Sequence, residues 1–139
     1  MVSITLKGRE VPLLFTTLEM KTIQEEIGPI DRANMIVTGR NPDDDKDTSK
    51  YGSVEHLTAA AKMIRILGNA GLEENDEAGD LTDKKVMRAL KPGDLPDAVR
   101  KCMEAMTEGM ASEHPAKAEQ SGPVDVVLEE IEKKSEAGS

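Results

Sequence analysis

Aromatic side chains are nearly missing from this sequence of 139 residues, which contains one phenylalanine, one tyrosine and no tryptophan. Cysteine occurs once, so an internal disulfide is excluded and a reducing compartment is favoured. No stretch approaches the ~20 apolar residues of a membrane span, and the first residues lack the basic start and long apolar run of a secretory signal. We therefore expect a cytoplasmic protein without membrane contact, whose core is built from aliphatic residues and methionines.

Positive charge is also scarce, because 27 acidic residues face 18 lysines and arginines and the net charge is −9. Proteins that hold nucleic acid through its phosphates depend on an excess of basic side chains. The charge balance therefore predicts that nucleic acid is not a partner. The chain length suits one domain with an additional terminal segment.

The first fifteen residues alternate between apolar and polar side chains, as expected for strands with one buried face. The apolar residues of this pattern are Val2, Ile4, Leu6, Val11, Leu13 and Phe15. Gly8 allows the chain to reverse, and Pro12 indicates that the second strand lies at a sheet edge or is irregular at that point. A lone hairpin is marginal in water, so we expect it to pack on helices.

Capping residues and apolar spacing predict helices along most of the remaining chain up to residue 110. The predicted ranges are 17–27, 30–37, 53–69, 82–90 and 94–109, with residues 38–52 as a loop. We expect Val54, Leu57 and Met87 to face the core, and Gly71 and Gly109 to end their helices. The fold class is thus α+β and mainly helical, with an N-terminal β-hairpin packed on about four helices and a flexible C-terminal tail.

Residues of the kinds used in catalysis are few and are not gathered in the sequence. His56 is expected to be a surface residue or a residue at the start of a helix, and His114 lies far from it in the sequence. Cys102 falls on an apolar helical stripe, which is typical of a core thiol, whereas a reactive thiol needs a cationic and partly exposed site. The sequence therefore predicts a non-enzymatic protein without a cofactor.

The aspartates of the loop at 38–52 raise the question of a calcium site. Asp43, Asp45 and Asp47 have the alternating spacing of the first ligands in a calcium-binding loop. That motif continues with glycine at its sixth position and glutamate at its twelfth, where this chain has Thr48 and Val54. We therefore favour a solvated acidic loop over a metal site.

The composition changes after Met110, which divides the chain into a domain at 1–110 and a flexible tail at 111–139. Within the tail, residues 124–134 form a short amphipathic segment that is too short to be a stable helix by itself. Its apolar residues at helical spacing are Val124, Val127, Leu128 and Ile131. These four are our candidate partner-binding residues, because such segments fold when a groove is offered. An inert tail is the alternative.

The order of features resembles the tail assembly chaperones of long-tailed bacteriophages and prophages. The most specific matches are the opening strands at 4–15, the segment at 81–96 and the ending Gly109-Met110. The resemblance implies a chaperone that binds the tape measure protein and helps to recruit the tail tube protein. It also implies a location in the host cytoplasm and absence from the finished virion.

Two other functions are compatible with an acidic chain of this size. A small acidic regulatory or inhibitor protein, such as an antitoxin or a DNA mimic, would gather its carboxylates on one face. A calcium-dependent module would use the aspartates at 43–47. The sequence leaves the formation of a homo-oligomer open.

Overall fold

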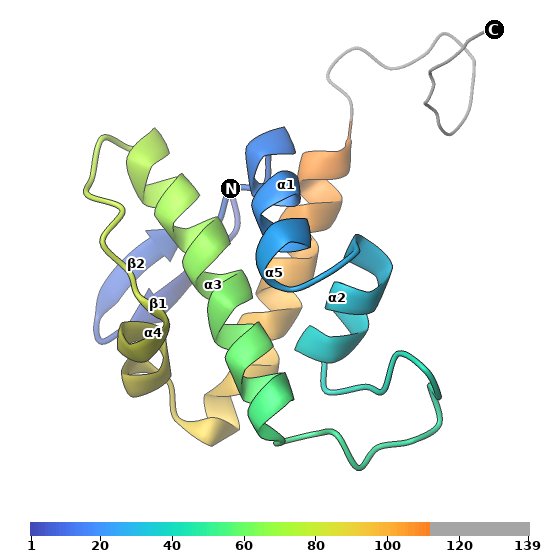
Figure 1. Cartoon of the computed structure of the whole chain (residues 1–139). Helices are drawn as coiled ribbons and strands as arrows, with labels where there is room; N and C mark the ends of the chain where they lie inside the picture. Colours follow the sequence, from blue (N-terminus) through green and yellow to red (C-terminus); the bar gives the residue numbers. More distant parts are fainter. Residues whose placement is uncertain (112–139) are drawn as a thin grey trace, which may run out of the picture.

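The structure is a computed structural model, and it describes residues 1–111 (Figure 1). Its elements in chain order are β1 (Ser3–Leu6), β2 (Arg9–Pro12), α1 (Thr17–Glu26), α2 (Ile30–Val37), α3 (Val54–Glu74), α4 (Asp83–Ala89), the 3-10 turn η1 (Pro92–Asp94) and α5 (Leu95–Met110). The mainly helical α+β fold with an N-terminal hairpin is confirmed, and one α-helix overlaps each of the five predicted ranges. The tail predicted at 111–139 lies, from residue 112 on, outside the described residues.

The hairpin forms as the alternating sequence predicts. β1 and β2 pair antiparallel, with Ile4 opposite Val11 and Leu6 opposite Arg9. Lys7 and Gly8 both have positive φ, which suits the turn type whose twist matches that of the strands. Ile4, Leu6 and Val11 are buried, so one face of the hairpin rests on the helices.

Helix α3 is the centre of the fold, and β2 and the helices α1, α2, α4 and α5 all pack on it (Figure 1). Small side chains at Ala59, Ala60 and Ala61 allow the neighbouring helices to approach closely. The core around α3 is aliphatic and methionine-rich, and Phe15 is the one buried phenylalanine, tyrosine or tryptophan among the described residues. Cys102 is fully buried in this core, as predicted.

The two glycines predicted to end helices have another role. Gly71 lies inside α3, which continues to Glu74, and Gly109 lies inside α5, which continues to Met110. A Cβ at Gly71 would overlap the carbonyl group of Pro12, and one at Gly109 would overlap that of Phe15. The end predicted at Gly71 was therefore wrong, whereas the end predicted at Gly109 lies one residue before the observed end of α5. Both glycines allow backbones to approach closely.

The apolar stripes are only partly buried. Val54 is 81% exposed, Leu57 40% and Met87 45%, although all three were predicted to face the core. Periodicity identifies the apolar face of a helix, but it does not show whether another element covers each turn of that face. Within residues 1–111, no helix is both long and apolar enough to cross a lipid bilayer.

Candidate partner-binding groove

An apolar groove lies where α3, α4 and the start of α5 meet. Its volume is about 230 Å³. The residues that line it are Leu57 and Ala61 of α3, Val86 and Met87 of α4, Leu90, Lys91 and Pro92 of the following turn, and Leu95 of α5. All of these except Lys91 have apolar side chains, and they include no aromatic ring. We call this hollow the apolar groove.

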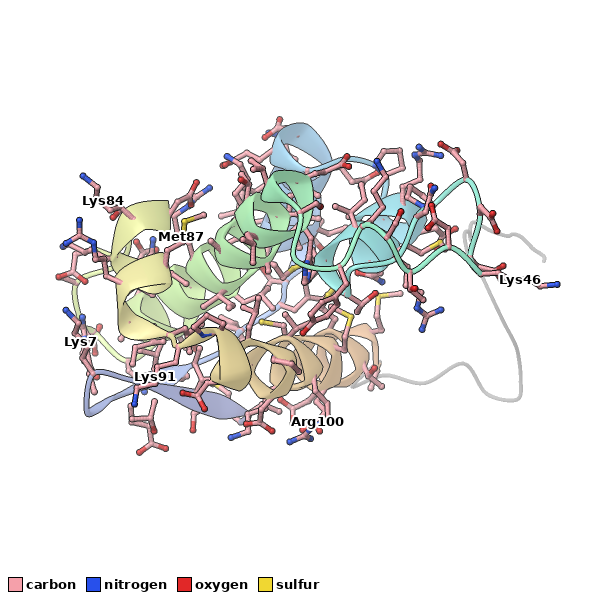
Figure 2. The ribbon with its side chains drawn as sticks, turned by 90° about the horizontal axis from the view of Figure 1, so that it is seen from below. Lys7, Lys46, Lys84, Met87, Lys91 and Arg100 are labelled. Atoms are coloured by element: carbon pink, nitrogen blue, oxygen red, sulfur yellow. The ribbon has the colours of Figure 1, made fainter. Side chains whose placement is uncertain are left out.

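The groove is open because one residue of α4 points into the core while the next one is exposed to solvent. Val86 is almost fully buried and anchors α4 in the core, whereas Met87 is 45% exposed at the groove. Figure 2 shows Met87 between α4 and α3. Leu57 meets it from α3 and is 40% exposed. The side chains that sequence periodicity assigned to the core therefore form the wall of a surface groove.

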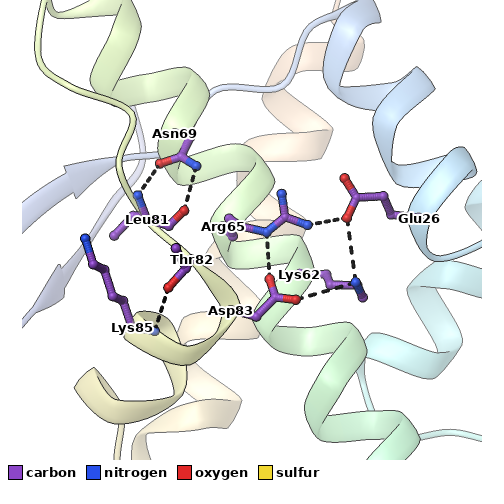
Figure 3. Close-up of polar contacts among 8 residues, drawn as sticks. All are labelled: Glu26, Lys62, Arg65, Asn69, Leu81, Thr82, Asp83 and Lys85. Carbon is purple, nitrogen blue, oxygen red and sulfur yellow. Dashed lines mark hydrogen bonds and ion pairs between the residues drawn. The ribbon is translucent and has the colours of Figure 1, made fainter.

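Polar contacts hold α4 against α3 (Figure 3). The side chain of Asn69 donates to the backbone carbonyl of Leu81 at 3.1 Å and accepts from its N–H at 2.9 Å. The Thr82 hydroxyl accepts the N–H of Lys85 at 3.1 Å and caps α4, as predicted from the sequence. These contacts fix the segment that enters α4, so one wall of the groove has a defined position.

A network of four charges adds to this attachment (Figure 3). Arg65 donates from Nε to Asp83 at 2.6 Å and also pairs with Glu26, while Lys62 Nζ lies 3.5 Å from Asp83 and 3.7 Å from Glu26. Burial by itself would lower the pKa of Arg65, but its hydrogen bonds with Asp83 and Glu26 raise it above the usual value. Asp83 also lies in the first turn of α4, where a negative charge suits the helix dipole.

Four basic residues lie on α4 and just after it, and we call them the cationic rim: Lys84, Lys85, Arg88 and Lys91. All four are exposed. Lys91 lines the groove itself, whereas the other three line a cleft of about 540 Å³ between α4 and the hairpin. Figure 2 shows Lys84, Met87 and Lys91 at the same end of the molecule as Lys7.

The cationic rim forms no ion pair within the described residues. Within residues 1–111, no carboxylate lies within ion-pair distance of the four rim residues, although Lys85 Nζ donates to the backbone carbonyl of Asp80. Arg9, which shares the cleft, is paired with Asp80 at 3.0 Å. A chain of net charge −9 thus carries a local cationic surface beside its apolar groove.

Sequence reasoning did not identify the rim or the groove as a site. A signal for the rim was present, because residues 84–91 contain four basic residues and no acidic one. The overall negative charge concealed it. The predicted partner-binding residues, Val124, Val127, Leu128 and Ile131, lie outside the described residues.

His56 lies in the first turn of α3, as one of the two predicted positions had it, but its side chain is buried, so the alternative of a surface position was wrong. Its Nδ1 accepts the N–H of Gly52 at 2.9 Å, and its ring lies 4.7 Å from the Tyr51 ring. Burial lowers the pKa of His56, and a hydrogen bond with the Val37 backbone partly offsets this shift. The imidazole therefore attaches the loop at 38–52 to α3.

Burial raises the pKa of the Cys102 thiol to about 12. A thiol with this pKa is almost entirely protonated at neutral pH and is a poor nucleophile. Its side chain is inaccessible as well. The structure therefore places Cys102 as a packing residue of α5.

The carboxylates of the aspartates at 43–47 do not share a common partner. Asp43 pairs with Arg32 at 3.1 Å. Asp47 accepts hydrogen bonds from Ser49 and Asn41, which lower its pKa to about 2. In the described part of the chain, no group of three or more acidic, histidine or cysteine side chains is arranged to hold a metal ion.

Comparisons with family models, with curated proteins and with solved structures give no significant match. The fold and the groove therefore have to be interpreted from the residues of this chain.

Proposed function

We propose that the chain is a non-enzymatic tail assembly chaperone of a long-tailed bacteriophage or prophage. It binds the tape measure protein in the host cytoplasm, helps to recruit tail tube subunits, and is absent from the finished virion. The proposal rests on the resemblance at 4–15, 81–96 and Gly109-Met110. The structural observation that supports it best is the apolar groove, which is open at Leu57 and Met87.

The groove suits the apolar stripe of a partner helix. Helices bind in such grooves through side chains at i, i+3, i+4 and i+7. The lining is aliphatic, and the unbranched side chain of Met87 can adjust to different neighbours. A tape measure protein offers many such stripes along its length, so a lining that accepts varied side chains fits this client.

The lack of aromatic residues fits a temporary complex. Tyrosine and tryptophan supply much of the binding energy at tight interfaces, and the groove has neither. A chaperone has to leave before the tail tube closes around the tape measure, so a weak and replaceable contact is an advantage. The net charge of −9 keeps chaperone-covered clients apart by like-charge repulsion.

The alternative of an acidic inhibitor that mimics DNA has less support. A DNA mimic needs its carboxylates together on the surface that meets the target. In the described residues, the cationic rim occupies the surface beside the groove instead. We therefore retain the chaperone as the proposed function.

Co-expression with the tape measure protein of the same genome tests the proposal. The chain should keep that protein in the soluble fraction and co-purify with it. Replacing Leu57 and Met87 together by aspartate should abolish both effects, because charges would enter the apolar groove. Leu18→Asp is the matched control, since Leu18 is 64% exposed on α1 and does not line the groove.

Thermal unfolding of each variant verifies that it is folded before its binding is interpreted. Retention of the tape measure protein by the folded Leu57 and Met87 double variant at the wild-type level would refute the groove as its site. Failure of the wild-type chain to bind the tape measure protein would refute the proposed function itself.

A further inference from the structure

The apolar groove and the cationic rim together define what kind of partner fits. The groove has an aliphatic lining that also includes Lys91. Lys84 and Arg88 line the neighbouring cleft along α4, and the three cations follow one another at spacings of four and three residues. A matching partner is therefore a short amphipathic segment with an apolar stripe and carboxylates along one flank of that stripe. A partner with a basic flank would be repelled by the rim.

Residues 124–132 of this chain have that pattern. Val124, Val127, Leu128 and Ile131 stand at i, i+3, i+4 and i+7. Asp125, Glu129 and Glu132 are spaced by four and three residues. In a helix they would therefore lie on one face, along one side of the apolar stripe. The nine residues contain four carboxylates and no basic side chain, whereas the rim has four cations.

The chain between the two parts is long enough to bring them together. α5 begins at Leu95, which lines the groove, and its 16 residues give it a length of about 24 Å. Figure 1 shows that α5 ends away from α4. The 13 residues at 111–123 span up to about 40 Å when extended, which exceeds the distance back along α5.

We propose that residues 124–132 bind in the apolar groove of their own chain, with the aliphatic stripe against Leu57 and Met87 and the acidic flank against the cationic rim. Linkage within one chain gives the segment an effective concentration in the millimolar range, so a weak contact is sufficient. The docked segment shields the exposed apolar wall of the groove until a partner with higher affinity displaces it. This inference goes beyond the proposed function and holds for any client.

Methyl NMR of the full-length chain with labelled methionines tests the proposal. The Met87 methyl group lies in the groove, whereas Met20 lies on α1 and does not line it. Replacing Val127 and Leu128 together by aspartate should shift the Met87 signal and leave the Met20 signal in place. The matched control replaces Ala116 and Ala118 by aspartate, which adds the same charge outside the segment and should shift neither signal.

A second variant tests the charges. Replacing Lys84, Arg88 and Lys91 by glutamine keeps the apolar groove, and added salt should then move the Met87 signal much less than in the wild-type chain. If the segment variant leaves the Met87 signal unchanged, or shifts Met20 equally, the proposal is refuted. A Met87 shift that disappears on dilution of the wild-type chain would assign the contact to a second copy and would also overturn it.

No client is used in these measurements, so their failure would leave the proposed function standing. Conversely, a chain that does not bind the tape measure protein could still show the segment in its groove.

Discussion

Gly71 of α3 lies directly against the backbone carbonyl of Pro12 at the end of β2, with no space for a side chain between them. This close approach joins the hairpin to the central helix, and the N–H of Leu14 continues it by donating to the carbonyl of Leu67 at 3.1 Å. The hairpin is therefore attached to α3 through backbone contact as well as through its buried face.

A methyl group at this position should destabilise the fold. We expect Gly71→Ala to lower the free energy of unfolding by about 1–3 kcal/mol, because backbone rather than a flexible side chain would have to move. Urea unfolding followed by circular dichroism measures the change. Gly93→Ala is the control, since a Cβ there meets nothing within 4 Å. Equal stability of the two variants would contradict the close approach.

The charge network at the start of α4 should contribute to stability. Asp83→Asn should cost about 1 kcal/mol, because it weakens the contacts with Arg65 and Lys62, and the loss should shrink at high salt. Asp97→Asn is a matched control, since Asp97 is also a first-turn carboxylate but pairs with cations on an exposed face of its own helix. A loss as large for Asp97→Asn would show that the network adds nothing beyond what a first-turn carboxylate with ion pairs inside its own helix contributes.

Acidification should weaken the attachment of the loop at 38–52. The pKa of His56 is lowered in the folded state, so the unfolded chain takes up the proton first as the pH falls. The stability that neutral His56 contributes is thus complete above pH ~6.5, the ordinary value for histidine, and is lost as the pH falls through the folded-state pKa.

Urea unfolding at a series of pH values from 7.5 to 5, in the wild-type chain and in His56→Gln, separates this effect from that of other groups. The wild-type chain should lose more stability than the variant across that range. Parallel curves would mean that the bond from the Gly52 N–H to His56 Nδ1 does not control the titration.

The Cys102 thiol should be unreactive while the protein is folded. Raising its pKa from 9.0 to about 12 reduces the thiolate fraction at neutral pH about a thousandfold, and burial blocks access as well. Labelling with a thiol reagent should therefore follow global unfolding, with a rate that rises sharply in urea. Rapid labelling in buffer alone would show that α5 opens locally at this residue.

The elements that sequence reasoning predicted well are those whose signals are local. Alternation placed the hairpin, the capping box at Thr16 and Glu19 placed the start of α1, and α2 has the predicted range. The role of Gly71 was predicted wrongly, because glycine is favoured both at a helix end and where two backbones approach closely. Only the second chain segment, here Pro12 or Phe15, distinguishes the two cases.

The candidate site could not be predicted for a related reason. The positions of Leu57 and Met87 on apolar stripes are encoded locally, but their exposure depends on how far α4 and α5 extend over α3. The cationic rim is a short run that the total charge conceals. Burial of His56 depends on the loop that folds over it, which no helical pattern reveals.

Photo-crosslinking at residue 87 tests the central claim, that the apolar groove holds the client helix. Met87 is replaced by p-benzoylphenylalanine in the full chain, which is co-expressed with the tape measure protein and irradiated; the same replacement of Leu18 on α1 is the reference. We predict a covalent product with the tape measure protein from position 87 and none from position 18. Equal products from both positions, or a product from position 18 alone, would contradict the account.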